Sequence, residues 1–383
     1  MSVEVFESDL RDNLYKIWNR MSSGTYFPPP VKAVEIPKPH GGGTRVLGVP
    51  TVADRVAQTV VALALGARTE SIFHDDSYGY RPRRSALDAL ARCRQRCQQK
   101  NWVLDLDVQK FFDSVDHDLV KAVEANTSLK WVVLYVKWWL RAPLALPDGT
   151  LAERSRGTPQ GSAVSPVLAN LFMHYAFDCW LEREFPTVEF ERYADDAVVH
   201  CVTERQARQV WAALEVRMAE VGLRLHPDKT KIVYCKDDNR PGSAEHTAFT
   251  FLGYQFCPRT VRGKHGRLFT AFVPAISPEA LNKISGEVRR WRLHTRTGHD
   301  LNDLAERINP IVRGWMTYYG RFFRSELHPL LKRINGYLVR WARKKYRRLA
   351  PFKRVKRWWD DLVDRHRGLF THWQWTGTFE WIR

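Results

Sequence analysis

Two adjacent carboxylates, Asp195 and Asp196, stand in the stretch RYADDAVVH between two short apolar runs. The flanks at 188–193 and 197–202 are rich in aromatic and β-branched residues, so they predict two strands and a tight turn that carries the pair. A single Asp-Asp pair is more often a solvated turn than a functional site. The alternative is a pair of anionic oxygen ligands on a rigid hairpin, which suits a hard divalent cation.

A further carboxylate, Asp107, follows a predicted buried strand that begins at Val103 in VLDLDVQKFFDSVDHDLV. A helix is expected after about Phe112. Phosphoryl transfer assisted by two Mg²⁺ ions needs carboxylates from separate elements that converge on one point. Asp107 and the Asp-Asp pair meet this need only if a folded sheet joins them. Alternatives in the same stretch are Asp105, Asp113, Asp116 and Asp118.

Two polar loops accompany the acidic stretches. In RGTPQGSAVSP, Gly157 and Gly161 allow close backbone approach to a ligand, and Gln160 offers both a donor and an acceptor. Lys229, in LHPDKTKI, is expected in a turn just ahead of a strand. Taken alone, each of these is more often an ordinary loop residue than a functional one.

The elements that must position these residues change along the chain. Residues 26–51 predict a β-hairpin with Lys38 and Arg45 near its bend. Helical patterns dominate 53–98, interrupted by SYGYRPRRS, whose Arg81 and Arg84 are expected to bind nucleic acid or to form a solvated turn. Strands and helices alternate over 102–270, and the pattern is helical from about 278.

Composition restricts the partners. The chain has 383 residues, 44% of them hydrophobic, and a net charge of +18, which favours a folded protein with a polyanionic partner, most simply nucleic acid. An anionic membrane surface is the competing interpretation. No long apolar run and no signal peptide are recognised, so a cytoplasmic location in a bacterium is expected. The six cysteines show no Cys-x-x-Cys pair, which disfavours a disulfide framework or a zinc site.

The order of the motifs resembles the reverse transcriptases encoded by bacterial group II introns, the reverse transcriptase/maturase family. The stretches RVLGVPTVADRVAQ, SYGYRPRRSALDAL, DVQKFFDSVDHDLV, GTPQGSAVSP, RYADDAVVH, LHPDKTKI and FLGYQF match its successive polymerase blocks, and INPIVRGWMTYYGRF, which contains Arg313, matches its maturase-specific thumb. The resemblance implies an α/β right-hand polymerase with fingers and palm, followed by an α-helical thumb. We expect fingers and palm over 1–272, thumb over 273–346 and a basic tail over 347–383.

The resemblance also implies roles for single residues at the polymerase site. Asp107, Asp195 and Asp196, with the Val108 carbonyl, would bind two Mg²⁺ ions, for which Mn²⁺ is an alternative. Lys229 would protonate the leaving pyrophosphate. The nucleotide-binding residues would be Lys38, Arg45, Gln160 and Phe112, the last as a steric gate against a ribose 2′-OH. The primer grip would be Phe251, Leu252, Gly253 and Tyr254.

The C-terminal region is strongly basic. Between Arg340 and Arg367 it has twelve Lys or Arg against three Asp, interleaved with tryptophan and tyrosine, which suits backbone contact plus stacking on RNA or DNA. A solvated helix face is the simpler alternative for such a run. The expected nucleic-acid contacts are Arg340, Arg343, Lys344, Lys345, Arg347 and Arg348.

The expected reaction is extension of a DNA primer with dNTPs on an RNA template, together with binding of group II intron RNA. Two rivals remain, a splicing cofactor without catalysis and a domesticated relative in defence or repair. The sequence begins close to LYKIWNRMSSGTYFPPP and shows no Cys- and His-rich nuclease domain after the thumb, so we expect neither the family's N-terminal template-handling segment nor DNA cleavage. Sequence gives no oligomeric state.

Overall fold

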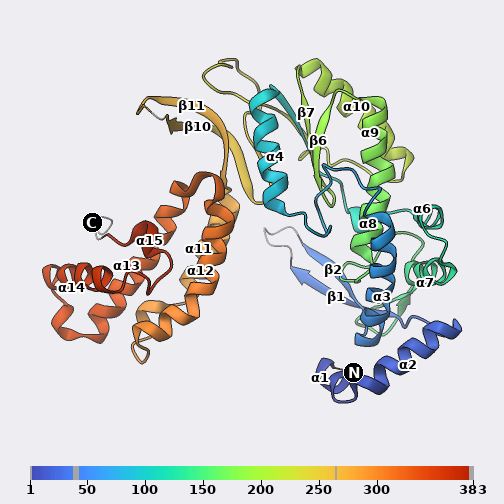
Figure 1. Ribbon diagram of the computed structural model, residues 1–383, viewed down its shortest axis with the longest axis horizontal. Coiled ribbons are helices and arrows are strands. Elements are labelled where there is room, and N and C mark those ends of the chain that lie inside the picture. The colour runs from blue at the N-terminus through green and yellow to red at the C-terminus, as the bar shows by residue number, and fades with distance from the viewer. Residues whose placement is uncertain (1, 38–42, 264, 379–383) are drawn as a thin grey trace. The chain divides into compact units, whose positions relative to one another are not determined.

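The chain divides into two compact units, Met1–Val233 and Tyr234–Arg383 (Figure 1). This computed structural model describes residues 2–37, 43–263 and 265–378, and the side chain of Arg45 is outside that description. Each unit has its own hydrophobic core. The expected boundaries at residues 272 and 346 concern functional parts and stay a prediction.

The central sheet of the first unit brings distant segments together. Its four strands follow the order β6-β7-β3-β8. The strands β6 and β7 form an antiparallel hairpin in which Tyr193 pairs with Asp196, and β3 pairs with β7 antiparallel, with Leu106 opposite Ala197. The predicted hairpin and the predicted strand before Asp107 are therefore confirmed. The strand bounds are β3 Trp102–Leu106, β6 Glu189–Tyr193, β7 Asp196–Cys201 and β8 Lys231–Tyr234.

Helices cover both faces of this sheet, α4 (Ala86–Gln99) on one side and α10 (Glu204–Glu220) on the other (Figure 1). Strand β7 is buried from Ala197 to Cys201, as expected for a strand covered on both faces. Ser85 caps α4 with a complete capping box. On the α4 side, the Arg96 guanidinium is buried and donates to Glu191 Oε1 at 2.6 Å.

The N-terminal part of the first unit carries a second, smaller sheet of order β2-β1-β4-β5. Strands β1 (Val31–Pro37) and β2 (Thr44–Val49) form the predicted antiparallel hairpin, and its bend at 38–42 lies outside the described residues. Strand β4 (Leu144–Ala145) pairs parallel with β1 and antiparallel with β5 (Leu151–Ala152). The other helices of this unit are α1 Val3–Glu7, α2 Leu10–Ser23, α3 Val52–Thr69, α5 Phe111–Ser114, α6 Leu119–Asn126, α7 Lys130–Arg141, α8 Ser165–Met173, the π-helix η1 His174–Asp178 and α9 Cys179–Glu184.

The second unit starts with an antiparallel sheet of order β11-β10-β9 and continues in helices, which confirms the helical pattern expected from about residue 278. Its core is rich in tryptophan, with Trp341, Trp359 and Trp373 almost fully buried. The strands are β9 Phe249–Phe251, β10 Tyr254–Arg262 and β11 Leu268–Ile276. The helices are α11 Pro278–Arg290, α12 Leu301–Phe323, α13 His328–Lys345, α14 Phe352–Arg365 and α15 Trp373–Thr376, with short 3-10 turns η2 Leu293–Thr295, η3 Arg324–Leu327 and η4 Arg347–Leu349.

Within the described parts of both units, every helix is too short or too polar to cross a lipid bilayer.

Candidate active site

The turn that carries Asp195 and Asp196 is held rigidly from behind. Strand β6 ends at Tyr193, and Ala194 takes a left-handed φ of 60° to reverse the chain. The buried Arg192 donates from Nη1 to the Ala194 carbonyl oxygen at 2.9 Å and is itself paired with the buried Asp178 at 2.6 Å. The two carboxylates are therefore presented by a fixed hairpin tip.

A loop from the arginine-rich stretch also packs on this turn. The backbone of Tyr78 donates to the Arg192 carbonyl at 2.8 Å. A Cβ on Gly79 would lie 2.4 Å from the Ala194 nitrogen, so only glycine fits this close approach. The Gly79 carbonyl accepts from Asn170 Nδ2 at 2.6 Å. Sequence reasoning missed these supporting residues, and the glycine in SYGYR was the local signal that could have indicated them.

Sheet register places Asp107 beside the acidic turn. The last pair of β3 with β7 is Leu106 opposite Ala197. Asp107 follows Leu106 and Asp196 precedes Ala197, so both carboxylates lie at the same edge of the sheet. Beyond the strand, the Asp107 carbonyl accepts from His226 N–H at 2.7 Å, and an isolated bridge joins Val108 to Leu225. The two hydrogen bonds that flank this bridge, from His226 N–H to the Asp107 carbonyl and from Gln109 N–H to the Arg224 carbonyl, use neither polar group of Val108.

The carboxylates at this edge of the sheet influence one another's pKa values. Removal from water and the charge of Asp107 raise the pKa of Asp195 above its ordinary value. The same causes, with the charge of Asp195, raise the pKa of Asp196 to about 7. Burial, Asp196 and Asp107 raise the pKa of Asp105 to about 7, although Lys231 opposes this. Lys229 Nζ lies 3.2 Å from Asp107 Oδ2 and supplies part of the missing positive charge.

The chemistry of this donor set suits a divalent cation. The ligand atoms would be carboxylate oxygens at the ends of two adjacent strands and one backbone carbonyl, which are the ligands that Mg²⁺ prefers. Burial, and after it the charge of neighbouring carboxylates, raises the pKa values of Asp195 and Asp196, and a bound cation would favour their ionised forms. The structure brings Asp107, Asp195, Asp196 and Lys229 to one place, and it leaves Asp105 on the neighbouring position, paired with Lys231 at 3.9 Å.

The GTPQG loop joins the same region to the fingers hairpin. The Phe112 carbonyl accepts from Thr158 N–H at 2.7 Å, and the Gln160 carbonyl accepts from Gly48 N–H at 2.9 Å. A Cβ on Gly157 would lie 2.8 Å from the Phe112 carbonyl oxygen, which explains the glycine. Phe112 and Gln160 are both half-buried. Lys38 and the side chain of Arg45 lie outside the described residues.

In the second unit, the stretch FLGY forms the turn between β9 and β10. Leu252 and Gly253 have φ values of 50° and 78°, while Phe251 and Tyr254 are buried. Tyr318 of α12 donates from its hydroxyl to the Leu252 carbonyl at 2.8 Å, and the Tyr254 hydroxyl donates to the Tyr318 carbonyl. The turn is thus fixed on α12, with its peptide units at the tip.

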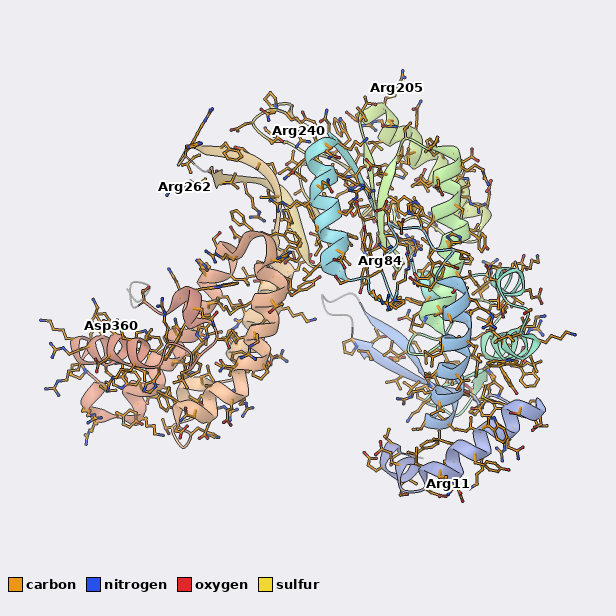
Figure 2. The ribbon with its side chains drawn as sticks, in the orientation of Figure 1. Arg11, Arg84, Arg205, Arg240, Arg262 and Asp360 are labelled. Atoms are coloured by element: carbon orange, nitrogen blue, oxygen red, sulfur yellow. The ribbon has the colours of Figure 1, made fainter. Side chains whose placement is uncertain are left out.

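One expected nucleic-acid contact is corrected. Arg81 is buried, and its guanidinium donates to Glu70 at 2.9 Å and to the carbonyl of His74 at 2.6 Å. Because these internal acceptors occupy its donors, Arg81 supports the loop rather than an external ligand. Arg84 lies just before α4 (Figure 2), half-exposed, and pairs with the exposed Asp75 at 2.8 Å.

The basic residues of the second unit are mostly accessible. Arg313, Arg340, Arg343, Lys344, Arg347 and Arg348 are exposed. Lys345 differs, because it is half-buried and its ammonium donates to the His299 carbonyl at 2.6 Å. Helix α14 has basic side chains in its first half, and its acidic residues Asp360, Asp361 and Asp364 lie in the second half. Asp360 is labelled in Figure 2. This order opposes the helix dipole, so the basic half does not serve helix stability.

The sheet with converging carboxylates at adjacent strand ends is the palm of a right-hand polymerase, with a hairpin of the fingers before it and a helical thumb after it. Residues 36–256 match the family model described as reverse transcriptase (RNA-dependent DNA polymerase). Residues 281–359 match the group II intron maturase-specific domain. The chain belongs to the reverse transcriptase family and is of the group II intron type.

The chain is similar to several curated proteins. It is 29% identical to Protein YkfC of Escherichia coli (strain K12) over 69% of this chain and 76% of that protein. It is 31% identical to group II intron-encoded protein LtrA of Lactococcus lactis subsp. cremoris, over 43% of this chain and 27% of LtrA. It is 30% identical to the putative COX1/OXI3 intron 1 protein of Saccharomyces cerevisiae, over 80% of this chain and 45% of that protein. The chain thus spans less than half of the last two relatives.

Proposed function

We propose that this reverse transcriptase extends the 3′-OH of a DNA primer with dNTPs on an RNA template, at the site formed by Asp107, Asp195 and Asp196. The observation that supports the proposal is that Asp107 directly follows the last β3–β7 pair, Leu106 opposite Ala197, at the edge of the sheet where Asp196 begins β7. Two Mg²⁺ ions, when bound by these carboxylates and the Val108 carbonyl, would stabilise the entering and leaving oxygens. Mn²⁺ is an alternative ion with the same ligand preference.

The residues around the carboxylates have complementary tasks in this reaction. Lys229 is the proton donor that we place here, because its exposed ammonium already reaches Asp107. Gln160 would flank the incoming nucleotide, and Phe112 would exclude a ribose 2′-OH. Lys38 and Arg45 would meet the triphosphate, for which a guanidinium offers bidentate hydrogen bonds. The FLGY turn would hold the primer backbone.

We also propose that the exposed basic residues of the second unit bind group II intron RNA and so assist splicing. The support is the match to the maturase-specific domain and the exposure of the arginine and lysine side chains on α12, α13 and η4. A bacterial cytoplasmic location stays a prediction from the sequence.

The polymerase assignment is tested by extension of a DNA primer on an RNA template. The wild-type protein should extend the primer with Mg²⁺, stop when EDTA is added, and resume when excess Mg²⁺ is restored. Asp195→Ala should abolish extension because it removes a cation ligand, while the thermal unfolding midpoint stays close to the wild-type value. Asp118→Ala is the matched control, since Asp118 is an exposed carboxylate paired with Lys121. Full extension by Asp195→Ala would refute the assignment.

A further inference from the structure

A buried chain of hydrogen bonds connects helix α3 to the GTPQG loop. Gln58 of α3 is fully buried, and its side-chain oxygen Oε1 accepts from Ser162 Oγ at 2.7 Å and from Ala163 N–H at 2.8 Å. Its Nε2 donates to Asp54 Oδ2 at 2.8 Å. Ser162 is also buried. Gln58 therefore holds the loop two residues beyond Gln160.

The orientation of the Gln58 amide is determined at both of its ends. The backbone N–H of Ala163 can only donate, so the side-chain oxygen must face it. The NH₂ group then faces Asp54, whose Oδ2 accepts from Gln58 Nε2 at 2.8 Å. An amide that is fixed in this way cannot rotate without leaving a buried polar group unpaired at one end, which is costly.

Asp54 is itself held by residues from two other segments. Its Oδ1 accepts from the Tyr26 hydroxyl at 3.0 Å and from Trp139 Nε1 at 2.8 Å. Asp54, Tyr26 and Trp139 are all buried. Burial raises the pKa of the Asp54 carboxyl, while the donors from Trp139, Tyr26 and Gln58 oppose that rise. Both lone-pair directions of Oδ1 are used by Tyr26 and Trp139, and Oδ2 remains for Gln58.

The anchored segment is a tight turn next to the predicted nucleotide contact. The Pro159 carbonyl accepts from Ser162 N–H at 3.2 Å and from Ser165 Oγ at 3.0 Å. Gly161 has a φ of 110°, which disfavours other residues there. Gln160 lies inside this turn, so a shift at Ser162 or Ala163 moves Gln160 as well.

We propose that Gln58, oriented by Asp54, is a positioning residue that fixes the GTPQG loop for the incoming nucleotide. This inference rests on the proposed polymerase function. Gln58 acts through the backbone of the loop and touches no reacting atom.

The test exchanges the donor and the acceptor between the two residues. Asp54→Asn places an NH₂ group against the Gln58 NH₂ group while Tyr26 and Trp139 hold the oxygen of the new amide. Gln58→Glu places two carboxylates against each other. The double variant Asp54→Asn/Gln58→Glu restores the pair, because the introduced amide can donate to the introduced carboxylate, whose second oxygen can accept from the loop. The double variant keeps one carboxylate in the pair, as in the wild type.

Single-nucleotide incorporation should separate positioning from a general structural role. Each single variant should raise the KM for dNTP by about ten-fold, the equivalent of one or two lost hydrogen bonds. The double variant should have a KM for dNTP within about three-fold of the wild-type value. Burst amplitude gives the fraction of active enzyme, so partial misfolding lowers the burst without raising KM. Tyr26→Phe is the matched control, since it removes a donor from Asp54 Oδ1 and leaves Gln58 paired at both ends.

Hydrogen–deuterium exchange over residues 157–164 gives a readout that does not need polymerase activity. The loop should exchange faster in both single variants and regain protection in the double variant. If the wild-type protein fails to extend any primer, the polymerase function fails while exchange still tests the anchor. If the double variant has the KM and the exchange of the worse single variant, the positioning role of Gln58 is wrong.

Discussion

Lys229 Nζ lies 3.2 Å from Asp107 Oδ2, and two residues further on Lys231 Nζ lies 3.9 Å from Asp105 Oδ2. The two pairs stand side by side at the end of the palm sheet, but they differ in access. The Lys229 side chain is 62% exposed, whereas that of Lys231 is 31% exposed. Of the two lysines, Lys229 is therefore the one that can leave its carboxylate for a substrate.

Replacement of Lys229 by Gln should slow nucleotide incorporation. If Lys229 protonates the leaving pyrophosphate, its loss should lower kcat by about 100-fold, the usual size of a general-acid contribution. Binding of primer-template should stay unchanged, because the lysine acts on the leaving group. Lys231→Gln is the matched control and should keep kcat within a few-fold of wild type. Equal losses in both variants would remove the proton-donor role from Lys229.

Replacement of Phe112 by Ala should relax discrimination against ribonucleotides. The half-buried ring would occupy the space that a 2′-OH needs, so its removal should raise the relative kcat/KM for a ribonucleotide by about ten-fold or more. The backbone of Phe112 still receives the Thr158 N–H, so the loop should stay in place. Phe112→Tyr keeps the ring and should keep the discrimination. An unchanged ratio in Phe112→Ala would place the steric gate elsewhere.

Local sequence patterns predicted the strands and the acidic turn because each depends on neighbours in the chain. The hairpin of β6 and β7 follows from the aromatic and β-branched residues on both sides of the acidic pair. The placement of Asp107 required pairing between segments far apart in sequence. The resemblance to a known family supplied that pairing, since no local pattern sets the register of β3 on β7.

Other features of the site could not be predicted from the sequence, because they depend on side chains that meet only in the folded unit. Arg81 belongs to a polar turn whose sequence predicts a solvent-facing side chain. Its guanidinium is instead buried, because it donates to Glu70 and to the carbonyl groups of His74 and Ser77. Gln58 looks like any helix residue until Asp54 and Ser162 are seen at its two ends. Buried polar contacts of this kind are the hardest part of a fold to predict from its sequence, because their partners are far apart in the chain.

The buried pair of His200 and Glu191 should make stability depend on pH. Burial alone lowers the pKa of His200, but Glu191, whose Oε2 lies 2.6 Å from His200 Nε2, and Cys97 reverse this and raise it to about 10. The folded protein thus holds this proton more tightly than the unfolded chain, with an ordinary value of 6.5. The contribution of the protonated His200 to the free energy of unfolding is complete below pH 6.5 and is lost as the pH rises towards 10. Arg96 also contacts Glu191 and keeps its charge throughout.

Urea unfolding between pH 6.5 and 10 measures this contribution. The free energy of unfolding of the first unit should fall across this range by more than about 1 kcal/mol, the equivalent of a single pKa unit. In His200→Gln the fall should be smaller, because the titrating group is gone. His246→Gln, which changes a histidine that is 43% exposed, should behave as wild type. Parallel curves for wild type and His200→Gln would contradict a charged His200 in the folded state.

Four exposed basic residues at the end of the thumb should account for a large part of RNA affinity. If Arg343, Lys344, Arg347 and Arg348 contact phosphates, each contact releases condensed counterion and adds roughly 0.7 to 0.9 to the slope of log affinity against log salt. Replacement of all four by Gln should therefore flatten the slope by about three for a structured, intron-like RNA. Lys345 is left in place because it is half-buried, whereas the four replaced side chains are exposed.

The matched control removes the same number of positive charges elsewhere. Lys121, Lys137, Arg183 and Arg208 are exposed or nearly so, and each pairs with a carboxylate of the first unit. Their replacement by Gln should leave the slope close to wild type, because a side chain that does not contact phosphate displaces no condensed counterion from the RNA. Primer extension at a saturating primer-template concentration should survive in the thumb variant, since Asp107 and Asp195 are intact. Equal slopes for the thumb variant and the wild type would show that these four residues form a solvated face, and the RNA-binding surface would then have to lie elsewhere.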